Sequence, residues 1–390
     1  MRQILVSENE AGQRADKLLA KYLDQAPKSF LYKMMRKKNI TLNGKRMQGN
    51  ELLRLGDEVT LFLAEETVQK FQSERLPRKP KKAATESSGI RAEKLRHFAG
   101  RIVYEDSHIL LFNKPAGMLS QRAKPQDISA VEYLTSYLLA SGSLTQTQLQ
   151  SFRPSVCNRL DRNTSGILAA GKSLAGLQKM SELLRDRSLH KYYCCIVKGT
   201  MTGSCRLKGY LVKDPNTNKV TILPSSSFDK VPMASSGACF PDEETQPDAG
   251  QLVRGTKEQP GAGQFVKAQK GRAYPELLDA KPIETEYRAI ASSGGLTLLE
   301  VLLLTGRSHQ IRAHLASIGH PILGDPKYGD PALNRIYQKS HGIDGQLLHA
   351  WRLDFPEIEG ALADLSHRQF TAPLPDCFLQ LFPEAASVPE

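Results

Sequence analysis

A polar turn that runs directly into an apolar stretch constrains this chain more than any other feature of its sequence. Asp161 stands between two arginines, in Arg-Leu-Asp-Arg, and small polar residues follow it. Residues 167–170 are apolar and read as a strand, which puts the acid on the turn that enters the strand. Asn-Thr-Ser-Gly is also ordinary surface-turn chemistry. The stretch therefore predicts either a solvated turn or a carboxylate that is held in place for chemistry.

A second functional class competes for the same stretch. Residues 166–173 fit G-x-x-x-x-G-K-S, the phosphate-binding P-loop pattern. A P-loop needs a strand before its first glycine and a permissive loop between the glycines, whereas here the strand-like residues lie between them. The later apolar run, 298–304, ends in Thr305-Gly306 and not in a magnesium-binding Asp. A P-loop nucleotide-binding enzyme is therefore kept only as a remote alternative.

Residues 159–166, Arg-Leu-Asp-Arg-Asn-Thr-Ser-Gly, with a strand after them, resemble the signature of the RluA-type pseudouridine synthases. In that family the Asp is catalytic. The resemblance runs from about residue 99 onward and includes three later motifs, at residues 191–199, 305–329 and 347–355. It implies an isomerase that converts uridine to pseudouridine in RNA, and a catalytically inactive RNA-binding protein of the same fold is the alternative.

The reaction breaks the bond from C1′ to N1, turns the base and joins C1′ to C5, without redox or net group transfer, so we expect no cofactor. It needs an ionised carboxylate, a cation that orients it, and a means of taking the nucleotide out of its stack. The resemblance implies that Asp161 is the carboxylate, Arg312 its ion-pair partner and Tyr193 the residue that stacks on the base near the departing C5 proton. It also implies substrate contacts by Arg162, which would fill the gap left by the flipped nucleotide, and by Arg159, Asn158, Lys114 and Arg307.

Two details of the motifs need separate interpretation. Many family members have His where this chain has Asn158, and Asn cannot carry a proton at neutral pH, so we expect this position to orient its neighbours. Tyr192 precedes Tyr193 in a predicted strand and should face the opposite side of the sheet.

The basic and imidazole side chains near the third motif do not predict a metal site. Arginines are interleaved with the histidines, and no acid or Cys stands at ligand spacing. We expect no metal from this segment, which contains Arg307, His309, Arg312, His314 and His320.

The N-terminal region predicts a second module. Two short helices precede Ile40-Thr41-Leu42, then comes Asn43-Gly44, a strong hairpin signal, and a further strand at 59–63. This order is similar to an S4 RNA-binding domain. Six cations within fourteen residues favour phosphate contact over a merely solvated face, and they are Lys33, Arg36, Lys37, Lys38, Lys45 and Arg46.

These readings predict an α+β protein. An S4-like domain at 1–66 would be followed by a basic flexible linker at 67–98 and a catalytic domain at 99–385, built on a mixed, largely antiparallel sheet with flanking helices. A segment rich in Ser, Gly, Pro and Gln at 224–281 reads as a low-complexity insertion, with a small accessory subdomain as its alternative.

The composition of the chain limits which binding partners and which cellular compartment we expect. The net charge is +12, and residues 1–98 hold 21 Lys and Arg against 12 Asp and Glu, a surplus of nine that favours a polyanion. The six cysteines form no C-x-x-C pair, and no apolar run approaches membrane length. We expect a cytoplasmic monomer that binds structured RNA, with ribosomal RNA favoured and tRNA the alternative.

Overall fold

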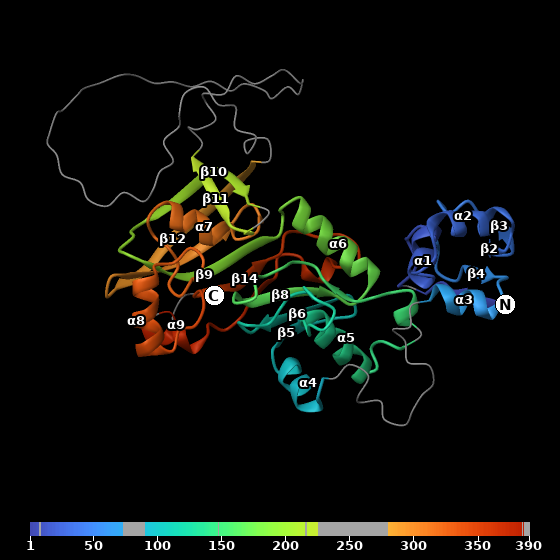
Figure 1. Ribbon diagram of the computed structural model, residues 1–390, viewed down its shortest axis with the longest axis horizontal. Coiled ribbons are helices and arrows are strands. Elements are labelled where there is room, and N and C mark those ends of the chain that lie inside the picture. Colours follow the sequence, from blue (N-terminus) through green and yellow to red (C-terminus); the bar gives the residue numbers. More distant parts are fainter. Residues whose placement is uncertain are drawn as a thin grey trace, which may run out of the picture.

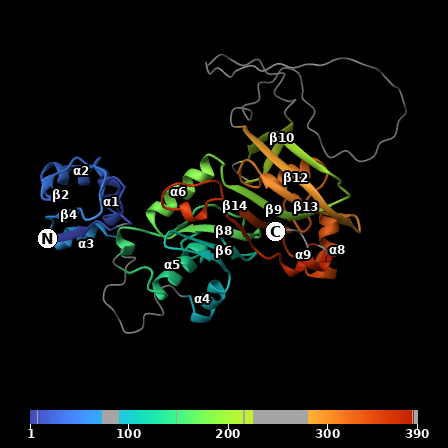
Figure 2. The same cartoon turned by 180° about the vertical axis from the view of Figure 1, so that it is seen from behind.

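The chain folds around two sheets of very different size (Figures 1 and 2). The computed structural model describes residues 1–7, 9–72, 90–146, 148–214, 217–224, 280–383 and 385. No helix in these ranges is long and apolar enough to cross a membrane.

The N-terminal unit is an antiparallel sheet with helices packed on it (Figure 1, blue). Its strand order is β1-β4-β2-β3, with β1 (Arg2–Leu5), β2 (Ile40–Leu42), β3 (Lys45–Arg46) and β4 (Glu58–Leu61). Its helices are α1 (Ala15–Tyr22), α2 (Lys28–Arg36) and α3 (Glu65–Phe71). The predicted helix pair and hairpin are confirmed, and Asn43 and Gly44 both have the positive φ that a tight hairpin turn requires. The unit has its own apolar core, built around Leu18, Leu19, Met35 and Val59.

Eleven of the described strands form the second sheet, whose main path runs β11-β10-β12-β13-β9-β14-β8-β6-β5. Only β14 and β8 pair in parallel, so the predicted mixed, largely antiparallel α+β architecture is confirmed. The strands are β5 (Ile102–Glu105), β6 (Ile109–Lys114), β7 (Ser155–Val156), β8 (Ser165–Gly171), β9 (His190–Lys198), β10 (Ser204–Lys213), β11 (Val220–Pro224), β12 (Lys281–Ser293), β13 (Leu296–Leu303), β14 (Leu348–Asp354) and β15 (Gln369–Thr371).

Helices cover both faces of the β5 to β8 end of this sheet. On one face α5 (Ala130–Ala140) and α4 (Ala92–Ala99) pack on β6 and β8, and on the other face α6 (Leu174–Arg185) does so (Figure 1). Ser129 and Glu132 form a capping box at the start of α5, which satisfies backbone N–H groups that a helix leaves free. The remaining helices are α7 (Gln310–Ser317), α8 (Pro331–His341) and α9 (Asp376–Leu381), with short 3-10 turns at 148–150 and 363–365.

Several expected boundaries differ from the structure. Both ends of the expected linker are helical: Val68 in α3 is buried in the N-terminal core, and Phe98 in α4 packs on the large sheet. Its middle, 73–89, and residues 225–279 of the expected insertion lie outside the described residues.

Some elements were not anticipated from the sequence: strands β1, β7, β10, β11 and β15 and helices α3, α4, α7, α8 and α9. Burial does not follow a clean alternation along β10, which leaves little strand signal. The tail after Pro373 contributes buried Phe378 and Phe382 to the core around Trp351.

Candidate active site

Asp161 lies in the turn that enters β8, as the sequence pattern predicts. The Thr164 N–H donates to the Asp161 carbonyl at 3.1 Å, and the seven residues of β8 are all buried. Gly166 has φ +107°, and a Cβ there would lie 2.2 Å from the carbonyl oxygen of Ala350 in β14. The close approach of these two strands therefore requires glycine at 166 and sets the position of the turn before it.

The turn is held from behind by the segment that follows β6. The Lys114 ammonium donates to the carbonyl oxygens of Pro115 (3.0 Å), Met118 (2.9 Å) and Arg162 (3.1 Å). The Ser120 hydroxyl donates to the Leu160 carbonyl at 2.8 Å and accepts from the Leu160 N–H at 3.0 Å. Burial lowers the pKa of Lys114 to about 7, against the opposing effect of the Asp161 charge. The backbone on both sides of Asp161 is thereby fixed.

The Asp161 carboxylate pairs with Arg312 of α7. Arg312 Nη1 lies 2.7 Å from Asp161 Oδ2, while Nε and Nη2 grip the two oxygens of Asp325 at 2.7 and 2.9 Å. The side chain of Asp325 is 0% exposed and that of Arg312 is 7% exposed, whereas that of Asp161 is 28% exposed. Asp325 therefore fixes the guanidinium from behind, and Arg312 presents one donor to a carboxylate that still faces solvent.

Burial alone would disfavour the charges of both Arg312 and Asp325. It opposes the ionisation of Arg312, but hydrogen bonds and charge from Asp325 and Asp161 outweigh it and raise the Arg312 pKa. Burial likewise acts to raise the Asp325 pKa, yet the hydrogen bond from Arg312 keeps it below its usual value. The two groups hold each other ionised in a dry setting, which is the condition for a fixed ion pair.

Tyr193 projects from β9 into the core on the α5 side of the sheet, where Ala350 and Val301 are its strand neighbours. Burial raises its pKa, and the charge of Asp161 adds to the increase, so the phenol stays neutral within electrostatic reach of the carboxylate. Tyr192 faces the other side, where the guanidinium of Arg352 stacks 3.9 Å from its ring centroid. The expected division of the two tyrosines between opposite faces is confirmed.

A histidine that carried no predicted role in catalysis also faces Asp161. His309 Nε2 lies 3.9 Å from Asp161 Oδ1, and His309 Nδ1 lies 2.9 Å from the Tyr328 hydroxyl. That hydroxyl also accepts from the Val220 N–H at 3.0 Å. The tautomer of a neutral His309 sets which of the two groups donates in the contact between Nδ1 and the hydroxyl. Burial lowers the His309 pKa, which favours the neutral ring.

The predicted substrate-binding residues fall into two groups. Arg159 and Arg162 are exposed beside Asp161, and Arg307 is exposed in the segment just before α7. Arg162 Nε donates to the Gly117 carbonyl at 3.2 Å. Asn158 and Lys114 are structural in this geometry. Asn158 Oδ1 accepts from the Ala169 N–H at 2.8 Å, which ties the turn to β8. Lys114 stays a predicted substrate contact, but in this structure its ammonium is fully buried and its three hydrogens are donated to backbone carbonyls.

Sequence reasoning missed Asp325, His309 and Tyr328. All three lie in the motif at 305–329, for which the family resemblance implies roles only for Arg307 and Arg312. The signal for Asp325 was that it is the single acid of this segment.

Two other expectations concern what the site could bind. No group of three or more His, Cys, Asp or Glu side chains in the described ranges is placed to hold a metal ion. In the stretch with the P-loop pattern, buried β8 fills the space between the two glycines, and Ser173 caps α6 by accepting from the Gly176 N–H at 3.0 Å.

The six predicted RNA-binding cations of the N-terminal unit, Lys33 to Arg46, are all exposed. They come from α2, the turn after it and β3. Within the described part of the chain none of them has an ion-pair partner, so their charge is available to an outside anion.

Comparison with known proteins shows the following similarities. The family model described as RNA pseudouridylate synthase matches residues 108–317. Ribosomal large subunit pseudouridine synthase C of Vibrio vulnificus is 26% identical over 351 residues, which cover 90% of this chain and 87% of that protein. The protein of the same name from Escherichia coli K12 is 27% identical over 354 residues, covering 90% and 88%. The solved structure of Human RNA Pseudouridylate Synthase Domain Containing 4 covers 74% of this chain and 93% of its own, with 21% identity and a TM-score of 0.49.

Proposed function

Because the chain belongs to the RNA pseudouridylate synthase family, we propose that it isomerises specific uridines of large-subunit ribosomal RNA and that Asp161 is its catalytic carboxylate. The protein is an isomerase that converts uridine to pseudouridine in RNA. Two relatives that match 90% of the chain carry the name ribosomal large subunit pseudouridine synthase C, which supports ribosomal RNA as the substrate. Action on ribosomal RNA would also place the protein in the cytoplasm.

The observation that carries the catalytic assignment is the chain of contacts from Asp325 through Arg312 to Asp161. Attack at C6, attack at C1′ and removal of a sugar proton all require an ionised, oriented carboxylate. Arg312 meets both requirements, since its planar fork is fixed by a buried acid and its remaining donor holds one oxygen of Asp161. The other oxygen, Oδ1, is left to face the nucleotide, with the His309 ring 3.9 Å away.

Residues near Asp161 would recognise the target nucleotide. Tyr193 would stack on the uracil, since its ring is rigidly placed and its hydroxyl is neutral. Arg162 is exposed on the same turn as Asp161 and could enter the stack in place of the flipped nucleotide. Its backbone carbonyl accepts from both Lys114 and the Gly117 N–H, so the side chain extends from a fixed base.

The N-terminal unit would bind RNA as an S4-like domain. Its two helices, tight hairpin and final strand follow in the S4-like order, and its six exposed cations gather on α2 and the hairpin. Such a surface holds phosphates without reading sequence. We propose that the protein acts as a monomer in which this unit and the catalytic unit bind the same RNA.

The test is Asp161→Asn, which keeps the size of the side chain and removes its charge. Pseudouridines would be mapped in ribosomal RNA from cells that lack the protein and carry either the parent chain, Asp161→Asn or, as a control, Asp364→Asn at an exposed acid of the 363–365 turn. We expect Asp161→Asn to restore no modification and the control to restore all of it. RNA affinity of the purified Asp161→Asn protein should stay within a few-fold of the parent, because phosphate contacts dominate affinity.

Restored modification by Asp161→Asn would contradict the catalytic assignment. A parent chain that restores no pseudouridine in ribosomal RNA, but modifies tRNA, would contradict the substrate and leave the isomerase chemistry intact.

A further inference from the structure

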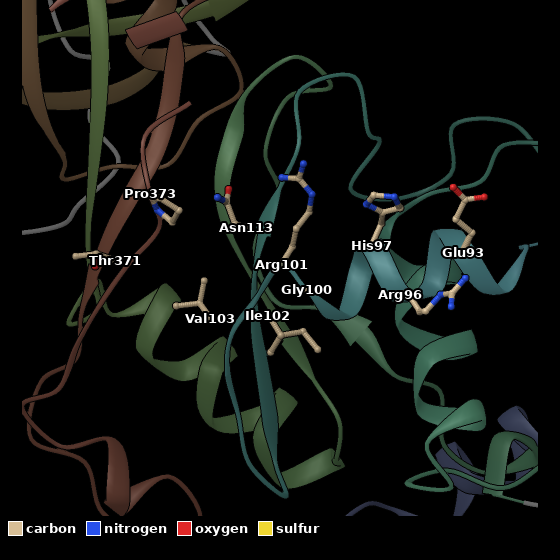
Figure 3. Close-up of a pocket in the computed structure, with 10 residues that line it drawn as sticks. All are labelled: Glu93, Arg96, His97, Gly100, Arg101, Ile102, Val103, Asn113, Thr371 and Pro373. Atoms are coloured by element: carbon tan, nitrogen blue, oxygen red, sulfur yellow. The ribbon is translucent and has the colours of Figure 1, made fainter. Parts of the chain in front are cut away.

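A pocket of about 870 Å³ lies at the β5 edge of the large sheet (Figure 3). We call it the edge pocket. Its walls come from α4, from β5 and the end of β6, and from the end of β15 and the chain just after it. The volume lies within the range of about 300 to 1,000 Å³ that is typical of ligand-binding pockets. The side chains that matter most for its chemistry are Arg96, His97, Arg101, Asn113 and Glu93.

The edge pocket is basic. Its lining holds two arginines, Arg96 and Arg101, against one acid, Glu93, which leaves a net charge of +1 with His97 neutral. Arg96 and Arg101 are exposed, and among the described residues neither has an ion-pair partner. Other exposed cations, such as Arg206 and Lys198, do pair with a neighbouring acid. The edge pocket thus presents unneutralised guanidinium groups, which suit the oxygens of an anionic ligand.

The cations of the edge pocket stand on a rigid support. Phe98 of α4 is buried, and its ring centroid lies 4.8 Å from that of Phe112 in β6. Tyr133 and Tyr137 of α5 contact the same ring at 6.0 and 5.7 Å. Because this cluster fixes one side of α4 to the sheet, Arg96 and His97 lie on the other side, in the wall of the pocket (Figure 3).

The edge pocket opens at the end of the sheet where the active site lies. Asn113 directly precedes Lys114, which donates to the carbonyl of Arg162 in the Asp161 turn. The Asn113 N–H donates to the Arg101 carbonyl at 2.8 Å, and Figure 3 shows the Arg101 side chain between those of Asn113 and His97. Strands β8, β6 and β5 are consecutive neighbours, so the start of β5 is only about 10 Å from the start of β8 across the sheet. A polymer bound over Asp161 can therefore reach both places.

We propose that the edge pocket binds backbone phosphates of the RNA strand that flanks the target uridine. Arg96 and Arg101 hold the phosphates, and His97 and the Asn113 amide offer hydrogen bonds to a phosphate or a ribose hydroxyl. The proposal rests on the proposed function, since it assumes RNA in the active site. The pocket places two arginines, His97 and Asn113 beside three apolar residues, and the unpaired guanidinium groups suit a sugar-phosphate chain better than a folded protein partner.

The experiment compares two double variants of the full chain. Arg96→Gln/Arg101→Gln removes two charges from the edge pocket, and Arg185→Gln/Arg335→Gln removes two exposed, unpaired charges from α6 and α8 as the matched control. Affinities for a labelled fragment of large-subunit ribosomal RNA and for poly(U) would be measured over a series of salt concentrations. All four arginines are exposed, so both variants should fold, which circular dichroism would check.

We expect the edge-pocket variant to lose about five- to thirtyfold in affinity at moderate salt, and its slope of log K against log salt to become shallower by about 1.4, or 0.7 for each phosphate contact to single-stranded RNA. The control variant should change affinity less than twofold. In the isomerase assay the loss should fall on kcat/KM, because the cations act on binding and not on the reacting atoms.

Equal losses in both variants would overturn the proposal, since they would show a diffuse effect of net charge. An unchanged salt slope in the edge-pocket variant would also overturn the proposal, because it would show that the pocket makes no phosphate contacts. This is the result expected if the pocket binds an acidic protein segment and not RNA. The poly(U) measurement separates this result from a failure of the proposed function, because binding to poly(U) does not depend on which RNA is modified. Suppose that the parent chain modifies no ribosomal RNA, but that its salt slope on poly(U) is still steeper than that of the edge-pocket variant. This result would contradict only the proposed substrate and would leave the pocket proposal intact.

Discussion

At the scale of single residues, Arg312 is the centre of the candidate active site because it contacts two acids that differ in their exposure to solvent. Asp325 takes two donors and is fully buried, whereas Asp161 takes one and is partly open. This asymmetry separates the structural requirement from the chemical one: the buried acid fixes the arginine, and the arginine fixes the exposed acid.

Replacing Arg312 should therefore have two distinguishable effects. Arg312→Lys keeps the charge but cannot grip Asp325 with two prongs and also reach Asp161, so we expect kcat to fall on the order of a hundredfold. Arg312→Ala also leaves Asp325 as an unpaired buried charge and should cost about 3 to 5 kcal/mol of folding stability. Single-turnover kinetics and urea denaturation would measure the two effects.

Arg352→Lys is the matched control for Arg312→Lys, because Arg352 is a largely buried arginine that pairs with Asp354 on the opposite face of the sheet. It should lower stability but not kcat. Full kcat in Arg312→Lys would show that charge alone suffices at this position.

Lys114 gives a prediction about pH. Its pKa is lowered from 10.5 to about 7 by burial, so between these values the unfolded chain holds a proton that the folded chain has released. The free energy of unfolding therefore rises with pH across this window. Below the window it is lowest, because Lys114 must then be protonated in its buried position in the folded protein. Relative to Lys114→Met, the parent should gain up to about 1.4 kcal/mol of unfolding free energy per pH unit above pH 7. Urea denaturation of both proteins across this pH range measures the difference.

The opposite outcome for Lys114 is equally informative. If the stability difference between parent and Lys114→Met stays constant through the window, the three carbonyl acceptors of Lys114 keep it charged despite its burial.

At the scale of secondary-structure elements, the parallel pairing of β8 with β14 positions the Asp161 turn. The two strands belong to distant parts of the sequence, and Ser165 and Gly166 pair with His349 and Ala350. Strand β9 pairs with the other edge of β14, and its Tyr193 lies on the face of the sheet that α5 covers. The site therefore depends on how closely three strands approach one another.

Gly166→Ala should disrupt this arrangement. Its Cβ would lie 2.2 Å from the Ala350 oxygen, so β8 must move, and we expect more than about 4 kcal/mol of destabilisation together with loss of isomerase activity. Gly142→Ala is the control, because Gly142 also has a positive φ but nothing lies within 4 Å of the added methyl. That variant should lose only about 1 to 2 kcal/mol and keep its activity. Thermal denaturation and activity assays of both would decide, and similar losses in the two would mean that φ alone matters.

At the scale of the whole molecule, two units with separate cores share one chain. Contacts between them are few in the described residues: the Ser151 hydroxyl donates to Glu10, and Arg153 lies 3.6 Å from Asp24. Under the proposed function both units bind one RNA, and their binding free energies combine, because one bound unit raises the effective concentration of the other.

Charge removal from the N-terminal hairpin tests this. Lys45→Gln/Arg46→Gln should weaken RNA binding and make the slope of log K against log salt shallower by about 1.4 to 1.8, while kcat at saturating RNA changes little. Lys17→Gln/Arg54→Gln removes two exposed cations of the same unit that lie outside α2 and the hairpin. Fluorescence anisotropy across a salt series compares them, and equal slopes for the two variants would argue against a specific RNA-binding surface there.

Local patterns in the sequence were sufficient for most elements near the site. The apolar run at 167–170 predicted β8, the spacing of leucines predicted a helix at 174–185, and alternation along β9 predicted that Tyr192 and Tyr193 face opposite ways. These features follow from a periodicity of two or 3.6 residues, which a sequence displays directly. The expected pairing of Asp161 with Arg312 came from resemblance to a family, since no local pattern joins residues 151 positions apart.

Only the folded chain reveals the remaining parts of the site. The grip of Asp325 on Arg312, the approach of His309 to Asp161 and the burial of Lys114 behind the turn are each contacts between separate elements. The edge pocket likewise brings Arg96 and Arg101 together with Asn113 and residues at the end of β15 and just after it. Side-chain identity states which groups are available, but distance and burial decide which charges pair and which stay free, and both are set by the packing of strands that are remote in the sequence.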